Sequence, residues 1–75
     1  MQKVRDGDIL IFGRAIFPEH KHDIENRGAV YVARYNDVQE EMNVILEGDT
    51  FAEYCGHIED FQNFKIGGNV YDNPN

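Results

Sequence analysis

Three histidines and one cysteine are the residues of this 75-residue chain whose types suit metal binding. His20 and His22 stand two positions apart in a polar stretch, and in an extended segment such residues point the same way. Cys55 and His57 form a second pair of the same spacing. The distance between the pairs matches none of the established zinc patterns. We therefore expect no metal and no cofactor, and keep His20 and His22 as candidate ligands of an alternative, metal-stabilised small domain.

Catalytic chemistry has little support in the residue types. The chain contains no serine and no glycine-rich phosphate loop, and Cys55 is the one candidate nucleophile. Two acidic pairs, Glu40–Glu41 and Glu59–Asp60, are adjacent in the chain, and adjacent side chains diverge on a helix or a strand. A chain of this length leaves little room for a substrate pocket beside a core. We expect a protein that is not an enzyme.

Charge is the most unusual property of the sequence. Fourteen acids and seven Lys or Arg residues give a net charge of −7. Residues 36–64 hold eight of the acids and no Lys or Arg at all. Such a surface repels nucleic acid and attracts a basic protein. The partner-binding residues that we expect are Asp37, Glu40, Glu41, Glu47, Glu53, Glu59 and Asp60.

Length and composition predict one small domain. Residues 1–75 can bury a single core, and 41% apolar with 28% charged residues is an ordinary globular balance. No apolar run is long enough to span a membrane, and the first residues lack the apolar stretch of a signal peptide. A lone cysteine favours a reducing compartment. These features predict a cytoplasmic protein without membrane contact.

Val, Ile and the aromatic residues dominate the apolar set, which favours a sheet. Residues 9–17 predict a first strand, 18–28 a polar loop, and 29–47 a hairpin. A helix over 37–46 is the competing interpretation of the second half of that hairpin. The segment 64–66 predicts a last strand, and 72–75 a frayed C-terminal tail.

The strongest helix signal begins at Thr50. Thr50 and Glu53 fit a capping box. The apolar residues that follow recur at helical spacing and predict one buried helix face: Phe51, Tyr54, Cys55, Ile58 and Phe61. The expected order is therefore β-β-β-α-β, an α+β domain in which one helix covers an antiparallel sheet of three to four strands.

Residues 4–10, Val-Arg-Asp-Gly-Asp-Ile-Leu, resemble the first strand of many small β-barrels. The profile of a very small acidic chain with one cysteine is similar to that of phage-encoded proteins that bind and inhibit host machinery, and the resemblance implies a host-takeover or anti-defence role. We expect a non-enzymatic inhibitor or modulator whose acidic surface, 36–64, docks on a basic partner such as a nucleic-acid-binding protein. The other alternative is a structural subunit that forms homo-oligomers through an apolar edge, 9–17 or 29–35.

Overall fold

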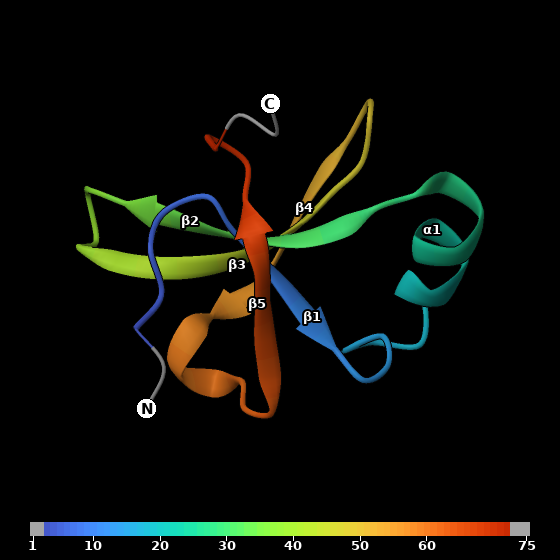
Figure 1. The fold of residues 1–75 in the computed structure, drawn as a ribbon, viewed down its shortest axis with the longest axis horizontal. Helices are drawn as coiled ribbons and strands as arrows, with labels where there is room; N and C mark the ends of the chain where they lie inside the picture. Colours follow the sequence, from blue (N-terminus) through green and yellow to red (C-terminus); the bar gives the residue numbers. More distant parts are fainter. Residues whose placement is uncertain (1–2, 73–75) are drawn as a thin grey trace.

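Five antiparallel strands and one short helix make up residues 3–72, the part of the chain that the computed structural model describes (Figure 1). In chain order the elements are β1 (Asp8–Phe12), α1 (His20–Arg27), β2 (Val30–Asn36), β3 (Glu41–Glu47), β4 (Ala52–His57), the 3-10 turn η1 (Ile58–Asp60) and β5 (Phe64–Asn69). One sheet holds all the strands in the order β4-β3-β2-β1-β5. The small α+β domain expected from the sequence is confirmed, with five strands in place of three to four.

The core lies on one face of the sheet, where the strand register brings large side chains into one row. Leu10 of β1 is paired with Tyr31 of β2, which is paired with Leu46 of β3. All three are buried, and Phe12 packs edge-on against Tyr31. Side chains alternate between the two faces of a strand, so the next residues along each strand face the other way.

The predicted hairpin is confirmed. β2 and β3 are paired without interruption from Val30–Glu47 to Asn36–Glu41. The turn between them is closed by the Asn36 side chain, whose Oδ1 accepts hydrogen bonds from the N–H groups of Val38 and Gln39 at 3.0 and 3.1 Å. This Asx turn ends β2 abruptly. The competing helix over 37–46 does not form.

The helix predicted to follow Thr50 is wrong, because residues 52–57 form strand β4 and only 58–60 form a single 3-10 turn. β4 supplies hydrogen-bonding partners for the edge of β3 that β2 leaves free. Its ladder contains a bulge: Ile45 is paired with Tyr54 but Val44 with Gly56, which leaves Cys55 as the extra residue. Gly56 has φ 145°, a conformation that an α-helix does not contain.

The prediction of a polar loop over 18–28 is also wrong, because His20–Arg27 is an eight-residue α-helix. Its C-terminus is closed by Gly28 at φ 68°, and the N–H groups of Gly28 and Ala29 both donate to the carbonyl of Asp23. The helix packs against the core through Ile24. The polar sequence of the helix gives no sign of this packing, because the other residue that faces inward is His20 and not an apolar residue.

On the opposite face of the sheet, an ion pair between Arg34 and Glu47 covers the middle of the strands. Arg34 donates to both carboxylate oxygens of Glu47 at 2.6 and 2.7 Å, and to the hydroxyl of Tyr71 at 3.1 Å. Glu47 lies opposite Val30, so the pair spans the row that contains Val32 and leaves that side chain only 1% exposed. The hydrogen bonds and charge of Glu47 raise the pKa of Arg34, against the effect of burial.

The outer strands of the sheet are β4 and β5, and both are irregular. β4 carries the bulge at Cys55, and the pairing of β5 with β1 shifts register between Asp8 and Leu10. β5 also contains Gly67 and Gly68, the second at φ 141°. The segments that were expected to offer an apolar edge for oligomers, 9–17 and 29–35, contain the interior strands β1 and β2 instead.

Two segments at opposite ends of the described chain are joined by a polar clasp. Asp8 is 3% exposed and accepts hydrogen bonds from the N–H of Arg5 at 2.7 Å and from the amide of Asn69 at 2.9 Å. The N–H of Val70 donates to Gly7, where an added Cβ would lie 2.6 Å from the ring of Tyr71. The clasp extends to Asp72, which pairs with Arg5. Residues 73–75 of the predicted tail lie outside the described residues.

Asp8 is expected to make folding stability depend on acid pH. Burial acts to raise the pKa of its carboxyl, but the hydrogen bonds from Arg5 and Asn69 and the charge of Arg5 outweigh it, so the pKa lies below the ordinary 3.8. A lowered native pKa gives stability that is present above pH 3.8 and is lost as the pH falls through the native value. In urea titrations, Asp8→Asn should be less stable than wild type at pH 7, and the two should converge as the pH falls below 3.8. The stability of an Asp49→Asn control should follow that of wild type at every pH. If the difference in stability between Asp8→Asn and wild type were the same at every pH, this role of Asp8 would be contradicted.

Candidate protein-docking site

The two candidate metal ligands, His20 and His22, both lie on α1 but have different surroundings. His20 is 1% exposed: its Nδ1 lies 2.9 Å from the hydroxyl of Tyr31 and its Nε2 2.9 Å from a carboxylate oxygen of Glu53. His22 is exposed and its Nδ1 contacts the side-chain amide of Asn26. Residues two apart point to different sides of a helix, so the geometry assumed for an extended segment is absent. Among residues 3–72, no group of three or more His, Cys, Asp or Glu side chains is placed to hold a metal ion.

His20 completes a chain of hydrogen bonds that links α1 to β2 and β4. The N–H of Ile16 donates to the oxygen of Tyr31 at 3.0 Å. With the ring proton on Nε2, His20 donates to Glu53 and accepts the Tyr31 hydroxyl proton at Nδ1. Burial, the largest effect, raises the pKa of Tyr31 and so keeps that proton in place. Every polar atom of the imidazole is satisfied, which makes His20 a structural anchor.

Cys55, the candidate nucleophile, lies on β4 and packs against the core. Burial raises the pKa of its thiol, the nearby carboxylate of Glu53 acts in the same direction, and a backbone hydrogen bond from Leu46 opposes both. An activated cysteine requires a lowered pKa. The surroundings of Cys55 therefore favour the unreactive thiol.

Two of the seven predicted partner-binding acids are engaged within the fold. Glu47 is held by Arg34, and Glu53 by His20. The remaining five lie in the β2–β3 turn, at the start of β3 and in η1, and we call them the acidic end: Asp37, Glu40, Glu41, Glu59 and Asp60. Within residues 3–72, no ion pair joins a Lys or Arg side chain to any of these five. The predicted acidic surface is thus divided, and the acidic end is the part that no Lys or Arg of the described residues neutralises.

His57, the last residue of β4, brings two carboxylates of the acidic end together. Its Nε2 lies 3.0 Å from Glu41 and its Nδ1 3.9 Å from the carboxylate of Glu59. Nδ1 also accepts a hydrogen bond from the backbone N–H of Glu59 at 3.2 Å and so caps η1. Residues that are 18 positions apart in the chain therefore share one imidazole.

Exposed apolar side chains lie beside the acidic end. Val38, at the tip of the β2–β3 turn, is 88% exposed, and Tyr35 is 51% exposed. Tyr35 lines a shallow hollow together with Asp6, Asp37 and Met42. An aromatic anchor within a charged rim is typical of protein interfaces. The sequence pointed to the acids and to Tyr35 as a possible interface anchor, but missed Asp6 and Val38, although Val38 is conspicuous as an isolated apolar residue in a polar turn.

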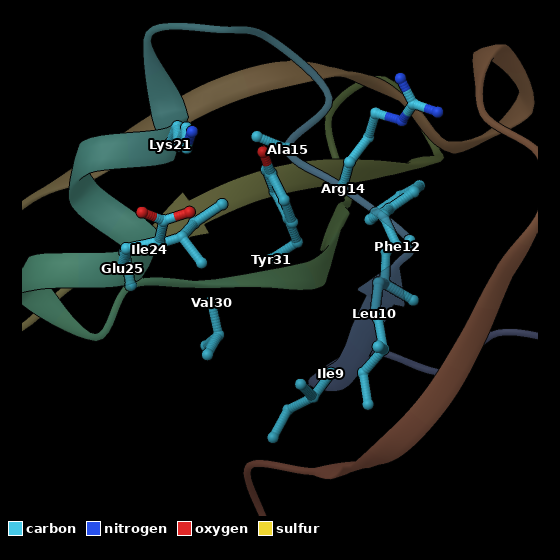
Figure 2. Close-up of a pocket in the computed structure, with 13 residues that line it drawn as sticks. Ile9, Leu10, Phe12, Arg14, Ala15, Lys21, Ile24, Glu25, Val30 and Tyr31 are labelled. Atoms are coloured by element: carbon cyan, nitrogen blue, oxygen red, sulfur yellow. The ribbon is translucent and has the colours of Figure 1, made fainter.

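A second hollow, of about 320 Å³, opens between β1 and α1 (Figure 2). It exists because β1 and β2 are paired only at Ile9–Val32 and Leu10–Tyr31 and then diverge. Figure 2 shows the β1 side chains on one side and those of α1 on the other. The lining is mostly aliphatic, and the Tyr31 hydroxyl that borders it is already engaged by Ile16 and His20. Ligand sites need converging polar groups to fix an orientation, whereas the charged side chains that border this hollow come from its two sides, Arg14 from one and Lys21 and Glu25 from the other.

No family model, no curated protein and no solved structure matches this chain. Among residues 3–72, no helix has the length and apolar character needed to cross a membrane. The acidic end with its exposed Tyr35 and Val38 is therefore the site on which a functional argument rests.

Proposed function

We propose that the protein is a small non-enzymatic binding protein, an inhibitor or modulator that docks its acidic end on the basic surface of another protein. The observation that carries the proposal is the convergence of Glu41 and Glu59 on His57, in a region where no Lys or Arg between residues 3 and 72 pairs with the acids. A nucleic-acid-binding groove presents the Lys and Arg side chains that such carboxylates would contact in place of phosphates.

The proposed mode of docking combines charge with a small apolar anchor. Exposed ion pairs contribute little each, so a docking surface made of carboxylates alone would bind weakly and would lose affinity in salt. Tyr35 and Val38 supply apolar contact area next to those charges. The acids would then guide encounter and set orientation, and the two apolar side chains would slow dissociation.

The test uses an arginine-rich peptide as a model of the basic surface. Asp37→Asn, Glu40→Gln and Asp60→Asn combined should weaken peptide binding roughly tenfold, about 0.5 kcal/mol for each exposed pair. Glu41 and Glu59 stay intact so that the contacts of His57 are preserved. Affinity is measured by fluorescence anisotropy at low and at physiological salt.

A matched control removes the same number of charges elsewhere. Glu19→Gln, Glu25→Gln and Asp49→Asn combined change three exposed acids outside the acidic end. This control should weaken binding by less than threefold. Equal losses in the two triple variants would mean that only net charge matters, and would reject docking through the acidic end.

A further inference from the structure

His57 occupies the junction between β4 and η1, where every charged contact comes from an acid. Glu41 of β3 lies at its Nε2, and Glu59 of η1 at its Nδ1, with Asp60 next in the chain. The residue paired with His57 across the strands is Asn43, and the residue paired with Asn43 on its other side, Arg34, is held by Glu47. The imidazole is therefore the single titratable base in contact with the acidic end among the described residues.

The hydrogen bond at Nδ1 has a direction that cannot be reversed. A backbone N–H only donates, so the bond from Glu59 requires a lone pair on Nδ1, which leaves the ring proton on Nε2, the nitrogen that lies 3.0 Å from a carboxylate oxygen of Glu41. His20 differs, because its Nδ1 meets the hydroxyl of Tyr31, which can donate or accept. Protonation of His57 must break a bond, whereas protonation of His20 need not.

We propose that His57 is a proton-operated switch within the acidic end. In its neutral form the imidazole caps η1 by accepting from the N–H of Glu59. When Nδ1 takes up a proton, that N–H loses its acceptor, and the new Nδ1–H turns to the carboxylate of Glu59, now 3.9 Å away. Histidine is the side chain whose charge ordinarily changes between about pH 5 and 8, which sets the pH range of the test.

The consequence for binding rests on the proposed function. Protonation adds one positive charge beside Glu41, which already contacts Nε2, and draws the carboxylate of Glu59 toward Nδ1. A basic partner then meets a less negative surface and a loosened η1. Mild acid should therefore release the partner, and neutral pH should restore docking.

NMR of the protein alone tests the switch. At pH 8, long-range ¹H–¹⁵N spectra should show His57 with its proton on Nε2. Between pH 8 and 5.5, the amide of Glu59 should shift upfield and exchange faster, with the same midpoint as the His57 ring. His57→Asn keeps a capping acceptor without this titration, and should abolish the pH dependence of that amide. A control, His22→Asn, should leave it unchanged.

An Nδ1–H tautomer at pH 8, or a Glu59 amide that stays constant while the His57 ring titrates, would overturn the switch. The binding arm uses the same arginine-rich peptide: wild-type affinity should fall roughly threefold from pH 7.5 to 6, and that of His57→Asn should not. If the triple variant of Asp37, Glu40 and Asp60 loses peptide binding but the Glu59 amide of the wild-type protein does not change with pH, the switch alone is rejected. If the Glu59 amide does change with pH but the triple variant binds the peptide as tightly as wild type, the proposed function alone is rejected.

Discussion

Replacing His20 with alanine is expected to lower the free energy of unfolding by roughly 2–5 kcal/mol. The side chain is 1% exposed and connects α1 to Tyr31 of β2 and Glu53 of β4. Its removal leaves a cavity and deprives the buried Tyr31 hydroxyl of its acceptor. A domain of this size has little stability to spare, so the variant should be largely unfolded at 37 °C. Urea denaturation followed by circular dichroism measures the change.

The matched control is His22→Ala, two residues along the same helix. His22 is exposed, and among residues 3–72 its hydrogen-bond partner is the side chain of Asn26, so its replacement should change stability by less than about 0.5 kcal/mol. Glu53→Gln keeps an acceptor for Nε2 and should lie between the two. Comparable losses at His20 and His22 would contradict the anchoring role and would revive a shared function of the two histidines.

Replacing Leu46 with alanine is expected to cost a similar 2–5 kcal/mol. Leu46 is 0% exposed and lies at the centre of the core row beside Tyr31. Truncation removes buried apolar contacts and opens a cavity that strands fixed by their ladders cannot close. Thermal unfolding followed by circular dichroism should show a fall in Tm of well over 10 °C.

The control for Leu46 is Val38→Ala, at a side chain that is 88% exposed. It should leave Tm within a few degrees of wild type, because no core contact is lost. The same variant should weaken peptide binding under the proposed function. If Leu46→Met, which nearly conserves volume, destabilised as much as Leu46→Ala, loss of packing would not be the cause.

The hairpin was predictable from the sequence because the signals that indicate it lie close together in the chain. Alternation in residues 30–35 and 42–46, separated by the turn signal at Asn36 and Asp37, needs no distant partner to be understood. The helix α1 was missed because its inward residues are Ile24 and His20, and a histidine does not register as apolar. Pro18 before it and Gly28 after it were the available signals.

The error at β4 has a physical origin. Phe51, Cys55, Ile58 and Phe61 do pack on the core, as their helical spacing predicted, whereas Tyr54 is exposed. A strand with a bulge followed by a 3-10 turn delivers the same residues to the same core. The spacing of the apolar residues alone cannot distinguish a helix from a strand followed by a 3-10 turn. The strand forms because it pairs with the edge of β3 that β2 leaves free.

The candidate site was predictable only in part, for a related reason. The acids of residues 36–64 are visible in the sequence, but their distant partners are not. Arg34 engages Glu47 and His20 engages Glu53, while His57 joins Glu41 to Glu59. Which carboxylates remain free is decided by strand register, and register depends on the whole sheet.

The irregular outer strands have a consequence for behaviour at high concentration. A straight, uninterrupted outer strand is a template on which further chains can add and grow into fibrils. Here an incoming chain would meet the bulge at Cys55 on one flank and the glycines 67 and 68 on the other, so neither flank offers a long regular template. We therefore expect the backbone itself to resist amyloid-like aggregation, in addition to the repulsion between like-charged molecules.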